Sequence, residues 1–151
     1  MRTEIATNHG GFGSKEELVT RLKTAGHEVV DLSARTVSDG NDYPDCVLTL
    51  ARAVVAGQVD RGITICASGV RLSVCANKVN GVRAVLIHDH FSAKESVEDD
   101  HMNILCMGGR TAFPLVAWDL VETFLNAKFS QEPRHLRRLG KVASAETEKS
   151  Q

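Results

Sequence analysis

The sequence has no long hydrophobic run and no excess of charge of either sign. No apolar stretch approaches the ~20 residues of a membrane-spanning helix, and no amino-terminal stretch combines the basic start, apolar middle and cleavage site of a signal peptide. The net charge of −1 argues against bulk attraction to nucleic acid or to a membrane surface. We therefore expect a cytoplasmic protein that binds small molecules or other proteins.

Paired cysteines are missing as well. The chain has four cysteines, without Cys-x-x-Cys spacing and too sparse for a disulfide scaffold: Cys46, Cys66, Cys75 and Cys106. This pattern predicts free thiols and argues against a zinc site. It also argues against a thiol redox protein, because Cys66 has no resolving cysteine two or three residues away.

What the 151 residues do contain is a regular alternation of strand-like and helix-like segments. The expected strands are 3–7, 27–32, 61–65, 82–87 and 103–107; the expected helices are 14–25, 44–56, 72–77, 91–99 and 112–127. Ser14 is expected to cap the first helix and Gly26 to end it. The alternation predicts an α/β fold, a three-layer αβα Rossmann-like domain with a five-stranded parallel sheet. This single domain should span residues 1–142, followed by a polar, disordered tail at 143–151.

Cys66 lies where an apolar run, 63–65, gives way to the small residues Ala67-Ser68-Gly69. That junction is the carboxyl end of an expected strand, where open α/β sheets bind their ligands. A thiol there can meet a substrate, although an inert core thiol is the alternative. Glycine-containing loops at 8–12 and 108–110 should lie at the same edge, and their backbone amides can bind an anion.

A basic cluster at 134–138, together with Arg110, offers guanidinium groups for phosphate; a solvated basic helix is the alternative. Several further landmarks occur in a fixed order: His9-Gly10-Gly11-Phe12, Gly26 to Asp31, Asp42-Tyr43-Pro44-Asp45, Asp60 to Ile63, Ile65-Cys66, Ala76 to Val79, Gly81 to Ala84, Asn103-Ile104-Leu105, and Arg134-His135 with Arg138. With these landmarks the chain resembles, from residue 3 to about 142, the ribose-5-phosphate isomerase B family, which includes galactose-6-phosphate isomerase subunits.

The resemblance implies an aldose–ketose isomerase of a phosphorylated sugar that needs no metal or organic cofactor. The default pair is ribose 5-phosphate and ribulose 5-phosphate. A thiolate at the position of Cys66 would carry a proton between neighbouring carbons through a cis-enediolate. Ser68 matches a hydroxyl that helps move the proton between oxygens. The amides from Gly69 through Val70 and Arg71 to Ser73 match the hole that stabilises the enediolate.

The same resemblance implies the remaining substrate contacts. Phosphate is expected to bind His9, Arg134 and Arg138, with Arg110 reaching in from a second subunit. Tyr43 is expected to line the sugar pocket, and further contacts are expected from Asn8, Asp100 and His135. The resemblance also implies a homodimer or a dimer of dimers with sites shared between subunits.

Four residues depart from the family pattern within this site. Asn8 replaces a usual Asp, and Ala67 and Arg71 replace usual glycines. Arg71 either adds a positive group for the substrate or points outward, and a glycine used for positive φ would tolerate it poorly. Asp99 stands at the position of the histidine credited with opening the sugar ring, and the nearby His101 is displaced by two residues.

These departures leave the substrate open. Asp99 acts as the ring-opening group, or His101 swings in, or the substrate needs no ring opening. The last case fits a tetrose such as erythrose or erythrulose 4-phosphate, because its phosphorylated O4 cannot close a five-membered ring. A hexose 6-phosphate is a further candidate substrate. A protein that binds a sugar phosphate without converting it is the competing interpretation from a different functional class.

Overall fold

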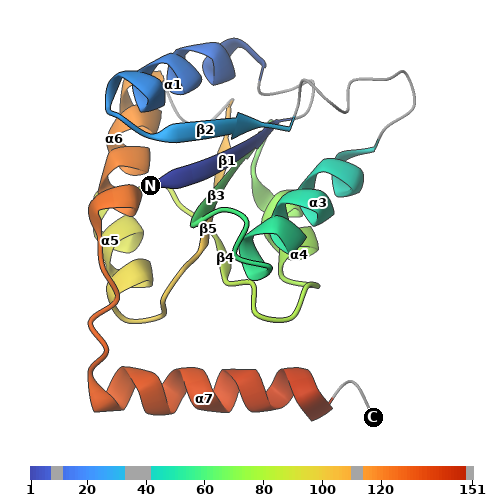
Figure 1. Cartoon of the computed structure of the whole chain (residues 1–151), viewed down its shortest axis with the longest axis vertical. Helices are drawn as coiled ribbons and strands as arrows, with labels where there is room; N and C mark the ends of the chain where they lie inside the picture. Colours follow the sequence, from blue (N-terminus) through green and yellow to red (C-terminus); the bar gives the residue numbers. More distant parts are fainter. Residues whose placement is uncertain (8–11, 33–41, 110–113, 149–151) are drawn as a thin grey trace.

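The computed structural model describes residues 1–7, 12–32, 42–109 and 114–148. These residues contain five strands, namely β1 (Arg2–Thr7), β2 (Glu28–Asp31), β3 (Arg61–Cys66), β4 (Ala84–Leu86) and β5 (Ile104–Gly108) (Figure 1). They also contain six helices, namely α1 (Phe12–Thr24), α3 (Tyr43–Val55), α4 (Val70–Ala76), α5 (His90–Glu98), α6 (Pro114–Asn126) and α7 (Pro133–Glu148). Every helix in these ranges is too short or too polar to span a membrane.

The strands form one parallel sheet in the order β2-β1-β3-β5-β4. β3 is the central strand, with β1 on one side and β5 on the other, and Cys66 at its end is opposite Gly108 of β5. The predicted five-stranded parallel sheet is therefore confirmed. Its central strand carries the cysteine singled out from the sequence.

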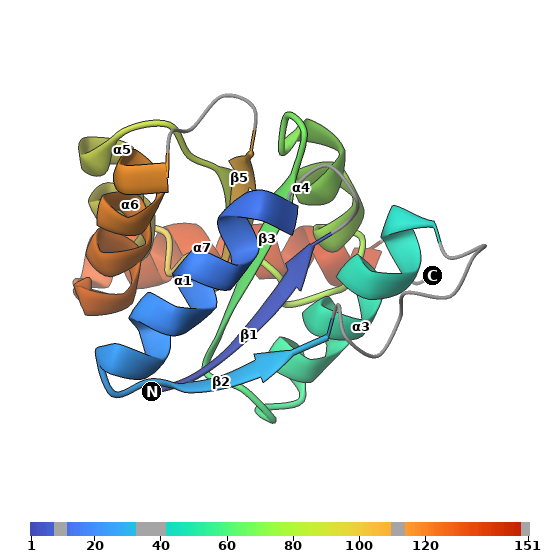
Figure 2. The ribbon, with the colours of Figure 1, turned by 90° about the horizontal axis from the view of Figure 1, so that it is seen from above.

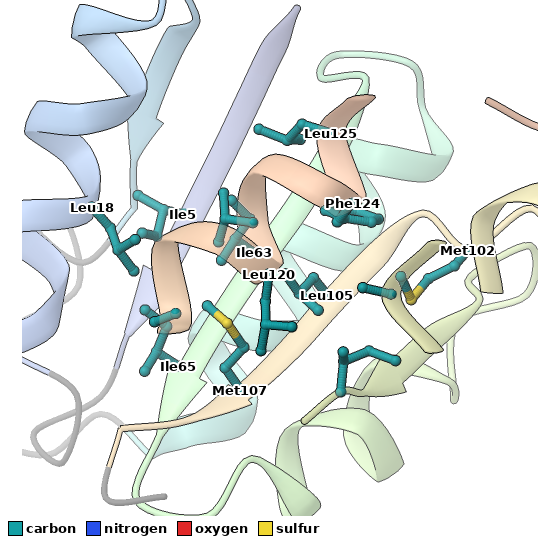
Figure 3. Packing of buried hydrophobic residues seen from close by; sticks show 14 of the residues in the cluster. Ile5, Leu18, Ile63, Ile65, Met102, Leu105, Met107, Leu120, Phe124 and Leu125 are labelled. Carbon is teal, nitrogen blue, oxygen red and sulfur yellow. The ribbon is translucent and has the colours of Figure 1, made fainter. Parts of the chain in front are cut away.

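Two apolar clusters fill the space on the two faces of the sheet. Helices α1, α5 and α6 cover one face, where Leu18, Leu120 and Phe124 pack against inward-facing strand residues (Figures 2 and 3). Helices α3 and α4 cover the other face, and Cys66 belongs to the cluster beneath them. Because successive strand residues point to opposite faces, the αβα layering puts Cys66 on the α3/α4 side.

Helix α7 lies outside these layers, below both of them in Figure 1. It contacts the domain at segments before β4 and after α5. The Glu146 carboxylate accepts the N–H of Gly81 at 3.0 and 3.1 Å, and the His135 ring lies 3.5 Å from the carboxylate of Asp99. Both contacts belong to the end of the sheet where the strands begin, which is opposite to the end that carries Cys66.

Some element boundaries differ from those expected. α1 begins at Phe12, so Ser14 lies inside the helix rather than capping it, and Ala25 is exposed. Gly26 does end the helix, in the left-handed conformation with φ of 84°. α7 continues to Glu148, so residues 143–148 are helical where a disordered tail was expected. Within this segment, the Glu146 carboxylate accepts the Gly81 N–H.

Candidate active site

Cys66 ends β3 and is followed by the bend that leads into α4. The Gly69 N–H donates a hydrogen bond of 3.1 Å to the Cys66 sulfur, and the sulfur is buried. Burial suits a core thiol as well as a shielded base. The directed N–H adds a specific feature, because it aims a backbone hydrogen-bond donor at the sulfur atom.

Position 69 in this turn accepts only glycine. Its φ is 79°, in the left-handed region, and it immediately precedes the first turn of α4. A Cβ atom there would lie 2.5 Å from Leu86 Cδ1 and 2.9 Å from the Met107 carbonyl carbon. Backbone conformation and close packing therefore both require glycine at the position whose N–H reaches the Cys66 sulfur.

The neighbouring thiol of Cys106 is unsuited to proton transfer. Cys106 lies within β5, opposite Thr64 of β3, and it is fully buried. Burial raises the pKa of Cys106 to about 12, so its thiol stays protonated at neutral pH. All four cysteines are free, and Cys66 is the one placed at a strand's carboxyl end.

The other residues predicted around Cys66 lie in the same bend and helix. Ser68 is half-buried in the bend, two residues from Cys66. Val70 opens α4 and is 53% exposed, so its side chain does not contribute to the core. The Ser73 hydroxyl donates to the Val70 carbonyl at 2.9 Å, and the Ser73 N–H points back to the Gly69 carbonyl at 3.4 Å. Both polar groups of Ser73 are thus hydrogen-bonded within the helix. The backbone amides that precede Ser73 belong to the first turn, where N–H groups have no partner from the helix itself.

Arg71 points toward α3. Its guanidinium lies over the Tyr43 ring, 5.4 Å from the ring centre, in a cation–π contact between the first turns of α4 and α3. Among the non-glycine residues described, positive φ occurs at His101 and Gln131, so Arg71 and Ala67 both adopt ordinary backbone conformations. The backbone is therefore unstrained at the two positions where the family usually has glycine. The Arg71 side chain lies beside Tyr43, the residue predicted to line the sugar pocket.

A second cluster forms around the buried ring of His135. Its Nδ1 atom lies 2.7 Å from the Ser130 hydroxyl and 3.5 Å from the Asp99 carboxylate, and its Nε2 atom accepts the Nε–H of Arg134 at 2.9 Å. Asp99 follows the last residue of α5, and Arg134 lies in the first turn of α7. Asp100 and Arg138 are exposed beside this cluster.

His101 is held away from the cluster. Its ring stacks on Phe129 with 4.6 Å between ring centres, and its carbonyl accepts the Nε–H of Arg83 at 2.7 Å. Burial lowers the pKa of His101, and the nearby guanidinium groups of Arg83 and Arg61 lower it further. A neutral stacked ring at this position is poorly placed to replace the group at Asp99.

The two clusters lie at opposite ends of the sheet within one chain. The guanidinium of Arg61, the first residue of β3, donates to the carbonyls of Phe124 and Ala127 at the end of α6. Gly62 donates to the Asn103 carbonyl, which places the segment after Asp99 beside the start of β3. Cys66 lies four residues further along the strand, about 13 Å away. The structure thus joins Cys66, Ser68, Arg71 and Tyr43, and separates them from the His135 cluster.

Three predicted contacts, Asn8, His9 and Arg110, lie outside the described residues. The contribution of Ser130 was not predicted from the sequence. It comes from a polar stretch without a recognisable motif, and only the packing of the α6–α7 connection against the end of α5 brings it to His135. In the described ranges, no group of three or more His, Cys, Asp or Glu residues is arranged to hold a metal ion.

Comparisons with known proteins identify the family of the chain. The model of the family described as Ribose/Galactose Isomerase matches residues 4–142. The Bacillus subtilis protein YwlF is 39% identical over 146 residues, which are 97% of each chain. Ribose-5-phosphate isomerase B of Escherichia coli is 36% identical over 92% of each chain. D-erythrulose-4-phosphate isomerase 2 of Mycolicibacterium smegmatis is 30% identical over 97% of each.

Solved structures give the same result. Ribose-5-phosphate isomerase B of Clostridium thermocellum superposes with a TM-score of 0.89 at 38% identity, covering 98% of this chain and 99% of the other. The enzyme of Mycoplasma genitalium with bound ribulose 5-phosphate superposes with a TM-score of 0.88 at 34% identity, covering 97% of both chains.

Proposed function

Because this chain belongs to the ribose/galactose isomerase family and is a sugar-phosphate isomerase, we propose that it interconverts ribose 5-phosphate and ribulose 5-phosphate. The observation that carries the proposal is the Cys66 sulfur at the end of β3, held 3.1 Å from the Gly69 N–H. A relative with bound ribulose 5-phosphate, similar over nearly the whole chain, supports the choice of sugar.

The proposed chemistry is one proton transfer between neighbouring carbons. The Cys66 thiolate removes the proton from the carbon next to the aldose carbonyl, and the electron pair moves to the carbonyl oxygen to form a cis-enediolate. The thiol then returns the proton to the former carbonyl carbon, while the Ser68 hydroxyl relays a proton between the two oxygens. The backbone amides of Val70 and Arg71, at the start of α4, stabilise the negative charge. No metal or organic cofactor is needed for these steps.

We further propose that two copies of the chain build each site. One chain keeps the Cys66 cluster and the His135 cluster at opposite ends of its sheet, so a single copy cannot bring both to one substrate. A second copy, related by two-fold symmetry, can place its own Arg134, Arg138 and Asp99 across from Cys66. In this arrangement the exposed guanidinium groups of Arg134 and Arg138, one helical turn apart on α7, bind the phosphate.

A tetrose 4-phosphate is the second candidate substrate. The observation in its favour is the stacking of His101 on Phe129, which leaves a carboxylate, Asp99, at the position credited with ring opening. A tetrose phosphorylated on O4 needs no ring opening, and a relative 30% identical to this chain is a D-erythrulose-4-phosphate isomerase. A hexose 6-phosphate has no comparable observation behind it.

The test is a panel of tetrose, pentose and hexose phosphates assayed for aldose–ketose conversion. We expect wild type to convert ribose 5-phosphate, and both Cys66→Ala and Cys66→Ser to lose conversion by at least about 10²-fold, with inorganic phosphate binding retained. Conversion by Cys66→Ala at the wild-type rate would remove Cys66 from the mechanism. Turnover of tetroses alone would select the second candidate.

The shared site has a separate test. Cys66→Ala and Arg134→Ala chains, each inactive alone, are co-expressed and purified together. If each site takes Cys66 from one copy and Arg134 from the other, random pairing makes half of the dimers hybrid. Each hybrid has one of its two sites intact, so roughly a quarter of wild-type activity should return. If both residues came from one chain, the mixture would stay inactive.

A further inference from the structure

The contacts of the His135 ring give its two nitrogen atoms different hydrogen-bonding roles. Arginine only donates hydrogen bonds, so the Nε2 atom 2.9 Å from Arg134 Nε must carry a lone pair. The ring hydrogen of the neutral form is then on Nδ1, which faces the Ser130 hydroxyl at 2.7 Å and the Asp99 carboxylate at 3.5 Å.

One imidazole ring therefore separates the two groups proposed to contact substrate. Arg134 lies at its Nε2 side and Asp99 at its Nδ1 side, while the ring itself is only 2% exposed. Arg134 is exposed, and the side chain of Asp99 is 34% exposed. His135 is too buried to touch a substrate directly, whereas both of its neighbours can.

We infer that His135 is a positioning residue that holds the Arg134 guanidinium for phosphate and the Asp99 carboxylate for ring opening at a fixed separation. This inference rests on the proposed function. It replaces a direct substrate contact by His135 with an action through two neighbours. The carboxylate of Asp99, at the position of the usual histidine, lies 3.5 Å from this imidazole on α7.

The Nε–H of Arg134 has a competing partner. Glu132 lies at 3.1 Å from the same nitrogen, in an ion pair whose two side chains are both more than half exposed. Exposed ion pairs contribute little to stability. The Glu132 carboxylate can also be removed without exposing a buried group. Glu132 is therefore a matched control for His135, because its removal takes one contact from Arg134 and leaves the other.

Two amide substitutions separate the two contacts of the ring. The amide of Asn reaches the position of Nδ1, so His135→Asn keeps a donor toward Ser130 and Asp99 but loses the acceptor for Arg134. The amide of Gln reaches the position of Nε2, so His135→Gln keeps that acceptor and loses the donor. If His135 had only a structural role, there would be no reason for one variant to affect phosphate binding and the other to affect turnover.

The experiment measures kcat and KM for ribose 5-phosphate and erythrose 4-phosphate, and inhibition by inorganic phosphate, in four proteins: wild type, His135→Asn, His135→Gln and Glu132→Gln. For His135→Asn we expect KM and the phosphate inhibition constant to rise about tenfold with kcat retained. For His135→Gln we expect KM to hold and kcat to fall about tenfold on ribose 5-phosphate but not on the tetrose. Glu132→Gln should change each value less than threefold.

Parallel losses in both His135 variants, on both substrates and together with a loss of thermal stability, would overturn the inference. A wild type that converts tetroses but not ribose 5-phosphate would overturn the Asp99 half. A wild type that converts no sugar phosphate refutes the proposed function instead. The Arg134 half is then decided by calorimetry with inorganic phosphate, where His135→Asn should bind about tenfold more weakly and His135→Gln like wild type.

Discussion

Replacing Gly69 by alanine should damage stability and activity together. The left-handed φ of 79° costs an L-residue about 1–2 kcal/mol. The added Cβ would also stand 2.9 Å from the Met107 carbonyl carbon and 2.5 Å from Leu86 Cδ1, and overpacking of this kind costs about 1–3 kcal/mol more. We therefore expect Gly69→Ala to lower the free energy of unfolding by about 2–5 kcal/mol, measured by urea denaturation.

The matched control is Gly26→Ala. Gly26 has a similar φ of 84°, but nothing lies within 4 Å of its Cβ position. This variant isolates the conformational cost, about 1–2 kcal/mol, and it should leave the isomerase activity unchanged. The difference between the two variants in free energy of unfolding then measures the cost of the close contact with β5 and Leu86.

Activity provides the second measurement. The Cβ that Gly69→Ala introduces can be accommodated only by moving the turn, and this movement carries the backbone N–H at that position away from the Cys66 sulfur. Removing one donor of this kind typically costs about 10²-fold in kcat. Adding Leu86→Ala should restore only part of the stability, because the Met107 backbone stays in place. Wild-type activity in Gly69→Ala, with stability no lower than that of Gly26→Ala, would refute this account of the turn.

Two titratable groups should make the stability depend on pH. Burial raises the pKa of Cys106 to about 12, so the unfolded chain loses this proton at a lower pH than the folded protein does. The free energy of unfolding should therefore fall above about pH 9, by at most ~1.4 kcal/mol per pH unit. In urea titrations at alkaline pH, Cys106→Ala should lack that slope. The pKa of His101 is lowered by burial and by two guanidinium groups, so the unfolded chain is protonated first and stability falls as pH drops below about 6.5. Asparagine tolerates the φ of 53° found at His101, so His101→Asn is a suitable variant. It should weaken the loss of stability at acid pH and change kcat less than twofold. A tenfold loss of kcat would assign His101 a part in the reaction.

Several landmarks of the family resemblance support the scaffold rather than the chemistry. The Asn77 side chain pairs with both backbone groups of Ala84, at 2.7 and 2.9 Å. Asn103 accepts the Arg83 N–H and donates to the Gly81 carbonyl. A Cβ on Gly62 would lie 2.4 Å from Leu50. Each of these residues makes specific backbone hydrogen bonds or a close packing contact near the end of a strand.

The sequence by itself determined the parallel sheet, because buried strands and amphipathic helices carry their own periodicity. It also located Cys66 at the carboxyl end of a strand, because that end is marked by where an apolar run stops. Both inferences use neighbouring residues only, and local sequence is sufficient for them.

Only the tertiary structure decided how the remaining polar residues group together. Arg71 meets Tyr43 across 28 positions, and His135 meets Asp99 across 36, through helix directions and packing that no local pattern encodes. The same packing separates Asp99 and the α7 arginines from Cys66 within one chain. Residue types and order were thus sufficient to predict the sugar-phosphate isomerase family, whereas the separation of the two clusters within one chain depends on the lengths and directions of the helices that connect the strands.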